Sequence, residues 1–115
     1  MGAEKEPRAK ILLMNNDEKN SFCGPGMIRL LIEIKETGSV RYACERMAMS
    51  YSKGWKLLRI MESCLGYPVT VRRQGGRNGG EARLTPEGLT FLENHQAFLQ
   101  DCQIAIKKVF DRYYC

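Results

Sequence analysis

The chain has 115 residues and a formal net charge of +5, which fits one small domain with a modest hydrophobic core. Its apolar content of 43% and charged content of 27% are typical of a soluble globular protein, and no apolar run approaches the roughly 20 residues that cross a bilayer. The first ten residues also lack the apolar stretch of a secretory signal, so we expect one cytoplasmic domain over residues 1–115 with no membrane contact.

The amino-terminal third predicts a short β-structure followed by a helix. Residues 9–23 begin with an apolar run, Ala9 to Met14, and continue into a polar, turn-prone stretch, which is typical of a strand and a hairpin. A Gly-Pro-Gly break at 24–26 interrupts the chain. Apolar residues then recur at helical spacing, which predicts a helix over 25–37 that Gly38 ends.

Two further helices, over 39–47 and 50–65, are expected to meet at a tight turn. Ser39 and Ser50 are residue types that cap helix N-termini, and the apolar residues of both segments follow a helical period. The second helix carries a packing stripe from Tyr51 to Leu65, and on its opposite face lie Ser52, Lys56, Arg59 and Ser63. A short helix, a turn and a longer helix with a basic outer face is the helix-turn-helix arrangement, whose second helix enters the DNA major groove.

Residues 69–84 predict a two-stranded ribbon beside these helices. The β-branched segment Val69 to Gln74 and the segment Glu81 to Leu84 flank a glycine-rich loop. This loop lacks the Lys-Ser/Thr pair and the strand-to-helix context of a phosphate-binding nucleotide loop. A ribbon directly after a helix-turn-helix is a wing, and we expect Arg72, Arg73 and Arg77 to meet DNA backbone or minor groove.

The positive charge is concentrated in these same elements. Residues 50–83 hold 7 basic and 2 acidic side chains, whereas residues 1–49 have a net charge of +1 and residues 84–115 a net charge of −1. Such clustering is the electrostatic pattern of a nucleic-acid contact surface. A merely solvated basic face is the alternative interpretation.

The last element is predicted to be one long helix over 85–113. Thr85, Pro86 and Glu87 supply an N-cap, a favourable first helical residue and a negative charge near the positive end of the helix dipole. A heptad-like stripe follows, formed by Leu92, His95, Leu99, Cys102, Ile106 and Val109. Such a stripe either packs on its own domain or pairs with a second copy. Because the helix should project beyond so small a core, we predict a homodimer.

Nothing in the sequence predicts an enzyme, a cofactor or a metal site. The five cysteines include no C-x-x-C pair, and the single histidine lies on the heptad stripe, so no catalytic or metal-binding grouping can be assembled. We expect reduced, structural thiols. Because Cys44 and Cys64 lie on the helix-turn-helix, a redox switch stays open as an alternative.

Several local motifs together resemble a known family. These are Gly38-Ser39-Val40, Met49-Ser50-Tyr51, Trp55, and the wing that runs into Ala82-Arg83-Leu84-Thr85-Pro86-Glu87-Gly88. Over about residues 9–110 the chain resembles the N-terminal DNA-binding domain of ModE-type, molybdate-responsive transcriptional regulators, which are LysR-like winged helices. The resemblance implies a mainly α fold with a small β component, a winged helix-turn-helix with a long C-terminal helix, and a dimer that binds operator DNA.

The resemblance also implies contact residues and reveals departures. It places recognition-helix contacts at Tyr51, Ser52, Lys53 and Lys56, and wing contacts at Arg73, Gln74, Arg77 and Asn78. Ala48 stands in the turn where the family usually has glycine, Gly54 stands where a bulkier residue is typical, and Asn78 and Glu81 interrupt the wing pattern. Full-length regulators carry a C-terminal oxyanion-binding domain that this sequence does not contain, so molybdate sensing is not expected of it.

The sequence therefore predicts a homodimeric transcriptional regulator that binds double-stranded DNA. The predicted DNA contacts are Tyr51, Ser52, Lys53, Lys56, Arg59, Arg72, Arg73, Gln74, Arg77 and Asn78. The alternative is a winged-helix adaptor that binds a protein partner through Phe98, Ile106 and Tyr113 of the last helix, with a basic face that serves only solubility.

Overall fold

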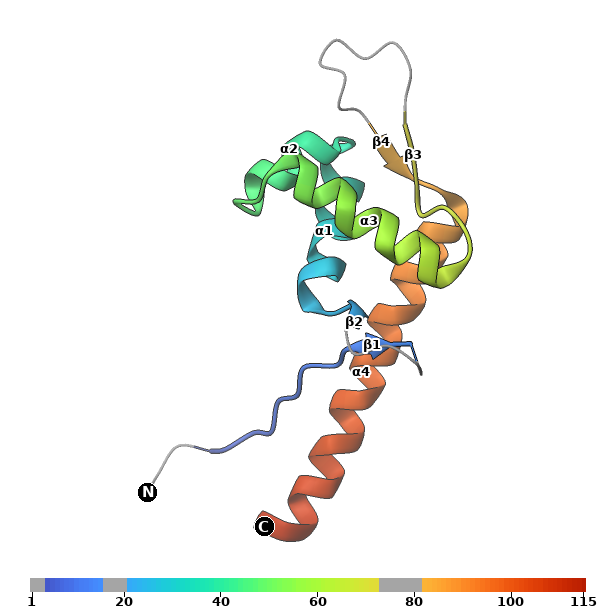
Figure 1. The fold of residues 1–115 in the computed structure, drawn as a ribbon. Helices are drawn as coiled ribbons and strands as arrows, with labels where there is room; N and C mark the ends of the chain where they lie inside the picture. The colour runs from blue at the N-terminus through green and yellow to red at the C-terminus, as the bar shows by residue number, and fades with distance from the viewer. Residues whose placement is uncertain (1–3, 16–20, 73–81) are drawn as a thin grey trace.

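The computed structural model describes residues 4–15, 21–72 and 82–115. Three helices gather in one body, and a fourth, longer helix runs from the base of a short ribbon past this body to the C-terminus (Figure 1). The molecule measures 58 × 36 × 24 Å because this last helix extends beyond the rest. In chain order the elements are β1 (Leu13–Met14), β2 (Ser21–Cys23), α1 (Pro25–Thr37), α2 (Val40–Arg46), α3 (Tyr51–Leu65), β3 (Thr70–Arg72), β4 (Ala82–Leu84) and α4 (Pro86–Tyr114).

Side-chain caps fix where three of the helices begin. The hydroxyl of Ser39 accepts a hydrogen bond from the Tyr42 amide at 3.1 Å, and that of Ser50 accepts one from the Lys53 amide at 3.1 Å. Both serines have extended backbone angles, so α2 and α3 begin one residue later than the predicted ranges 39–47 and 50–65. Thr85 caps α4 in the same way, through the amide of Gly88 at 2.9 Å.

The amino-terminal hairpin is shorter than the sequence indicated. The apolar run Ala9 to Met14 predicted a full strand, but β1 holds only Leu13 and Met14, which pair with β2 in an antiparallel, irregular register. The residues before β1 follow another course, and the side chain of Gln103 in α4 donates a hydrogen bond to the carbonyl of Pro7 at 3.0 Å. A short two-stranded ribbon gains little stability by itself, so contact with α4 replaces further pairing.

The hydrophobic core lies where α1, α2, α3 and the first turns of α4 meet. Its fully buried side chains include Leu30, Leu31, Ile34, Val40, Leu58, Met61, Val69 and Leu92. Each large apolar side chain buried here contributes about 1.5–3 kcal/mol relative to exposure. The helical apolar stripes predicted for α1, α2 and α3 therefore close on one common core.

A buried carboxylate joins the first two helices. The Glu33 side chain is only 2% exposed, and its two oxygens lie 2.8 Å from Arg29 on α1 and 3.0 Å from Arg46 at the end of α2. Sequence reasoning did not single out Glu33. The pair with Arg46 fixes the amino-terminal half of the helix-turn-helix to α1.

Hydrogen bonds hold the base of the ribbon against the helices. One carboxylate oxygen of Glu62 on α3 accepts from the amides of Val69 and Thr70 at 2.8 and 3.3 Å. The amide of Ala82 donates to the carbonyl of Gly38 at 3.1 Å, and the Thr85 hydroxyl donates to the carbonyl of Pro68 at 2.7 Å. The antiparallel pair β3–β4 is thus tied to α3 on one side and to the end of α1 on the other.

Candidate nucleic-acid interface

The turn between α2 and α3 is built on an unusual backbone conformation. Ala48 has a φ of +55°, which places it in the left-handed region that favours glycine. Its neighbour Met49 donates its amide to the carbonyl of Cys44 at 3.0 Å, which closes the turn. Ala48 is therefore a point of local strain, since an alanine adopts a conformation that favours glycine.

Gly54 allows α3 to lie directly on α2. A Cβ added at this glycine would overlap the sulfur of Cys44, which is fully buried in α2. The helix accepts the propensity cost of a central glycine because only a hydrogen leaves room for that sulfur. The second departure thus sets the distance between the two helices of the motif.

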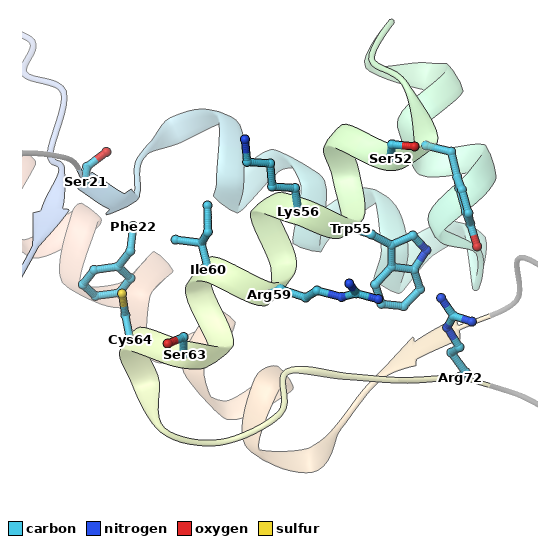
Figure 2. Close-up of a pocket in the computed structure, with 11 residues that line it drawn as sticks. Ser21, Phe22, Ser52, Trp55, Lys56, Arg59, Ile60, Ser63, Cys64 and Arg72 are labelled. Atoms are coloured by element: carbon cyan, nitrogen blue, oxygen red, sulfur yellow. The ribbon is translucent and has the colours of Figure 1, made fainter.

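The outer face of α3 presents the predicted contact residues to solvent. Ser52, Lys53, Lys56 and Arg59 are exposed, whereas Tyr51 is half-buried at the start of the helix. Figure 2 shows Ser52, Lys56 and Arg59 along successive turns of one helix, with Arg72 reaching toward the same region from β3. The structure therefore brings together the five described recognition-helix residues and one of the predicted wing residues.

Two arginines stack on the aromatic side chains of α3. The guanidinium carbon of Arg72 lies 4.5 Å from the centroid of the Trp55 ring, and that of Arg41 on α2 lies 4.5 Å from the centroid of Tyr51. The two rings meet edge to face, with centroids 6.3 Å apart. Sequence reasoning missed Arg41 and assigned Trp55 to the packing face, because the stacking depends on how α2 and β3 dock against α3.

A groove follows this face from the wing to the amino-terminal hairpin. Its lining residues are Ser21, Phe22, Tyr51, Ser52, Trp55, Lys56, Arg59, Ile60, Ser63, Cys64 and Arg72 (Figure 2). The hairpin therefore supplies one wall of the groove, which the sequence did not predict. The sulfur of Cys64 accepts a hydrogen bond from the side-chain amide of Asn15 at 3.2 Å, so this thiol is engaged within the fold.

The remaining predicted wing contacts lie outside the described residues. These are Arg73, Gln74, Arg77 and Asn78; the departure at Glu81 also lies outside them. Arg72, at the end of β3, is the one predicted wing contact that the structure describes. The guanidinium of Arg72 lies against α3 because it stacks on the ring of Trp55.

The predicted dimerisation stripe divides into two parts. Leu92 and His95 are buried within the chain's own fold, where α1 contacts α4, and their part in a dimer stays a prediction. His95 stacks against Phe91 at a centroid distance of 5.6 Å, and burial lowers the pKa of its imidazole. Farther along, Leu99, Cys102 and Ile106 are half-buried, and Val109 is exposed.

Cys23 and Cys44 are buried in the core as free thiols. Burial raises the pKa of Cys23 to about 11 and also raises that of Cys44, so both are held as neutral thiols. Among residues 4–15, 21–72 and 82–115 no group of three or more His, Cys, Asp or Glu side chains is placed to hold a metal ion. Within the same residues, no helix is long and apolar enough to cross a membrane.

The architecture of helix, turn, recognition helix, β-ribbon and long final helix defines a winged helix-turn-helix domain, which confirms the predicted fold class. Residues 26–89 match the model of the bacterial regulatory helix-turn-helix proteins of the lysR family. The chain belongs to this family.

The curated relatives confirm the resemblance to ModE proteins. The transcriptional regulator ModE of Haemophilus influenzae is 36% identical over 76 residues, which are 66% of this chain and 30% of that protein. The DNA-binding transcriptional dual regulator ModE of Escherichia coli K12 is 28% identical over 104 residues, or 90% of this chain and 40% of that protein. The chain thus spans less than half the length of these relatives and matches their N-terminal regions.

Solved structures of low sequence identity share the fold. The DNA-binding domain of CbnR, crystallised as a DNA complex, has a TM-score of 0.58 at 20% identity and covers 76% of this chain and 94% of its own. ArgP from Mycobacterium tuberculosis has a TM-score of 0.54 at 24% identity, with 76% of this chain and 32% of that chain covered.

Proposed function

We propose that this chain binds double-stranded DNA as the reading domain of a homodimeric transcriptional regulator, with α3 in the major groove and the wing on backbone or minor groove. The observation that carries the proposal is the set of cations on the α3 face. Four cations on this face take part in none of the ion pairs within the described residues: Lys53, Lys56, Arg59 and Arg72. By contrast, Arg29 and Arg46 are both bound to Glu33. Cations that the fold leaves unneutralised are the groups that attract DNA phosphates.

The roles of the side chains follow from their chemistry. Lys53, Arg59 and Arg72 supply phosphate contacts, and Ser52 and Lys56 reach base edges from the exposed first turns of α3. The wing residues Arg73, Gln74, Arg77 and Asn78 extend the contact beyond the helix. The ModE relative of Escherichia coli bears the name of a DNA-binding regulator, which supports the same assignment for this homologous segment.

The dimer is proposed from the far half of α4. This helix has 29 residues and is about 43 Å long, so it extends beyond the core that its first turns cover. On and beside the predicted stripe, apolar side chains remain open there, with Phe98 45% and Val109 44% exposed. Pairing of two such helices would bury this surface, and a twofold axis would set two α3 helices on successive major grooves about 34 Å apart.

The DNA proposal is tested by fluorescence anisotropy with a random duplex and with a duplex selected from a random pool, each titrated from 50 to 200 mM salt. If the dimer neutralises ~6 to 10 phosphates, affinity falls by ~10³ to 10⁵ over this range. The double variant Lys53→Glu and Lys56→Glu should abolish tight binding. The control variant Lys5→Glu and Lys35→Glu makes the same change in net charge at exposed positions away from α3 and should retain binding.

A protein-binding adaptor is the second candidate, favoured by the exposed aromatic end of α4. Tyr113 is 77% exposed and Tyr114 is 74% exposed, which is unusual for large aromatic side chains. If both duplexes bind weakly and alike, the adaptor replaces the regulator as the proposed function.

The dimer is tested by sedimentation of the wild-type protein and of Val109→Lys. The substitution should shift the protein to monomer, and a wild-type monomer at high concentration would contradict the dimer.

A further inference from the structure

We propose that Tyr51 and Trp55 are positioning residues that hold Arg41 and Arg72 for contacts with phosphates on the two flanks of α3. This inference rests on the proposed DNA binding and adds to it one contact residue, Arg41, and a role for two aromatic rings. The four side chains form what we call the arginine–aromatic row: Arg41, Tyr51, Trp55 and Arg72.

The row is continuous across three elements of the fold. Tyr51 and Trp55 are four residues apart on α3, so their rings are neighbours on one face and lie 6.3 Å apart at an interplanar angle of 83°. Each ring has a guanidinium 4.5 Å from its centroid, from α2 at one end and from β3 at the other. The two arginines therefore flank the pair of rings, with Arg41 on the side of α2 and Arg72 on the side of β3.

Stacking fixes an arginine without consuming its hydrogen-bond donors. A guanidinium that stacks on a ring presents its face to that ring, so its N–H groups, which lie in its own plane, stay free to bind a phosphate in bidentate geometry. Within the described residues, neither Arg41 nor Arg72 has a carboxylate within ion-pair distance. Both groups are therefore held in place and remain electrostatically available.

Packing alone does not account for a tryptophan at position 55. The indole Nε1 of Trp55 is buried and has no hydrogen-bond partner in the described part of the chain. A buried donor without a partner is unfavourable, so an apolar side chain would fill this space at lower cost. Tryptophan is, however, the strongest cation–π partner among the aromatic residues, which matches the guanidinium above it.

The ribbon supplies a matched control for Arg72. Arg72 pairs with Ala82 across the ribbon, whereas Arg83 pairs with Val71. Because successive side chains of a strand point to opposite faces, Arg83 lies on the face of the ribbon that does not stack on Trp55. Removal of Arg83 therefore removes the same charge from the same ribbon and leaves the row intact.

The test compares the slope of log affinity against log salt for a selected duplex in wild type, Arg41→Ala, Arg72→Ala and Arg83→Ala. Arg41→Ala and Arg72→Ala should each lower the slope by about 0.9 per bound protomer, which corresponds to one lost phosphate contact. Arg83→Ala should leave the slope unchanged. A steep wild-type slope that neither Arg41→Ala nor Arg72→Ala reduces would overturn the inference and leave the proposed DNA binding standing.

The positioning role is tested through Trp55. Trp55→Phe keeps a ring face and should retain the wild-type slope, whereas Trp55→Leu should lower it as much as Arg72→Ala, with no further loss in the double variant. Full additivity in the double variant would refute positioning.

Trp55 is the single tryptophan of the chain, so its fluorescence reports the stacking in the absence of DNA. Arg72→Ala should increase the quenching of this fluorescence by acrylamide, and unchanged quenching would contradict the stack. A flat wild-type slope would instead refute the proposed function.

Discussion

The packing of α3 on α2 can be tested by adding one methyl group at Gly54. In wild type this methyl overlaps the sulfur of Cys44, and overpacking in a close-packed core costs about 1–3 kcal/mol. Alanine also gains about 1 kcal/mol over glycine in a helix interior, which opposes the overlap. We therefore expect Gly54→Ala to lower the free energy of unfolding by about 1 kcal/mol.

The sign of this effect should reverse when the sulfur is removed. In a Cys44→Ala background the next atoms are Val40 Cγ1 at 3.8 Å and Met49 Sδ at 3.9 Å, which are ordinary contact distances. Gly54→Ala should then raise stability by about 1 kcal/mol, because only the helix propensity term remains. The coupling between the two sites is therefore expected to be about 2 kcal/mol.

Urea unfolding followed by circular dichroism measures both effects. Gly26→Ala is the matched control, since a Cβ at this position in α1 meets nothing within 4 Å and its effect should be the same in both backgrounds. If Gly54→Ala changes stability equally with and without the Cys44 sulfur, the reasoning about this contact is refuted.

Three further predictions concern single residues. Ala48→Gly should raise the free energy of unfolding by about 0.5–1 kcal/mol in urea unfolding, since the relief of about 1–2 kcal/mol of left-handed strain exceeds the cost of the unfolded-state entropy that glycine adds; a loss would contradict the strain. Glu33→Gln should lower the free energy of unfolding by about 1.5–3 kcal/mol in the same assay, because the substitution removes a buried charge that is bound to two arginines. An unchanged urea midpoint would contradict the stabilising role of these ion pairs. Burial lowers the pKa of His95 in the folded state, so the unfolded state binds more protons and stability should fall as the pH drops below about 6.5. Thermal unfolding of His95→Gln should lose this part of the pH dependence, and an unchanged pH profile would assign it to other groups.

Periodicity and turn chemistry in the sequence predicted much of the fold. The apolar stripes, the caps Ser39, Ser50 and Thr85, and the stop at Gly38 are local signals, and local signals specify where helices begin and end. The amino-terminal strand was overestimated because the apolar run at residues 9–14 is equally suited to lying against a helix. Leu92 and His95 belong to the predicted stripe although the chain's own core buries them, because a stripe cannot reveal which of its turns that core covers.

The candidate site was predictable in its location but not in its internal arrangement. Charge clustering pointed to α3 and the ribbon, since charge excess is a property of the sequence itself, and DNA binding by this face stays a prediction. The stacking of Arg41 depends on the crossing of α2 over α3, which the Gly54 contact with Cys44 controls. No local pattern encodes such a crossing distance.

The arginines of this domain illustrate why charge alone does not define a binding surface. Arg46 and Arg41 lie on the same short helix, yet the first is bound to the buried Glu33 and the second rests on the ring of Tyr51. A carboxylate neutralises the charge that it holds, whereas an aromatic ring holds the charge and leaves it effective at a distance. Arg46 therefore stabilises the helix-turn-helix, and Arg41, held in place without being neutralised, is the arginine of α2 that is suited to meet a phosphate.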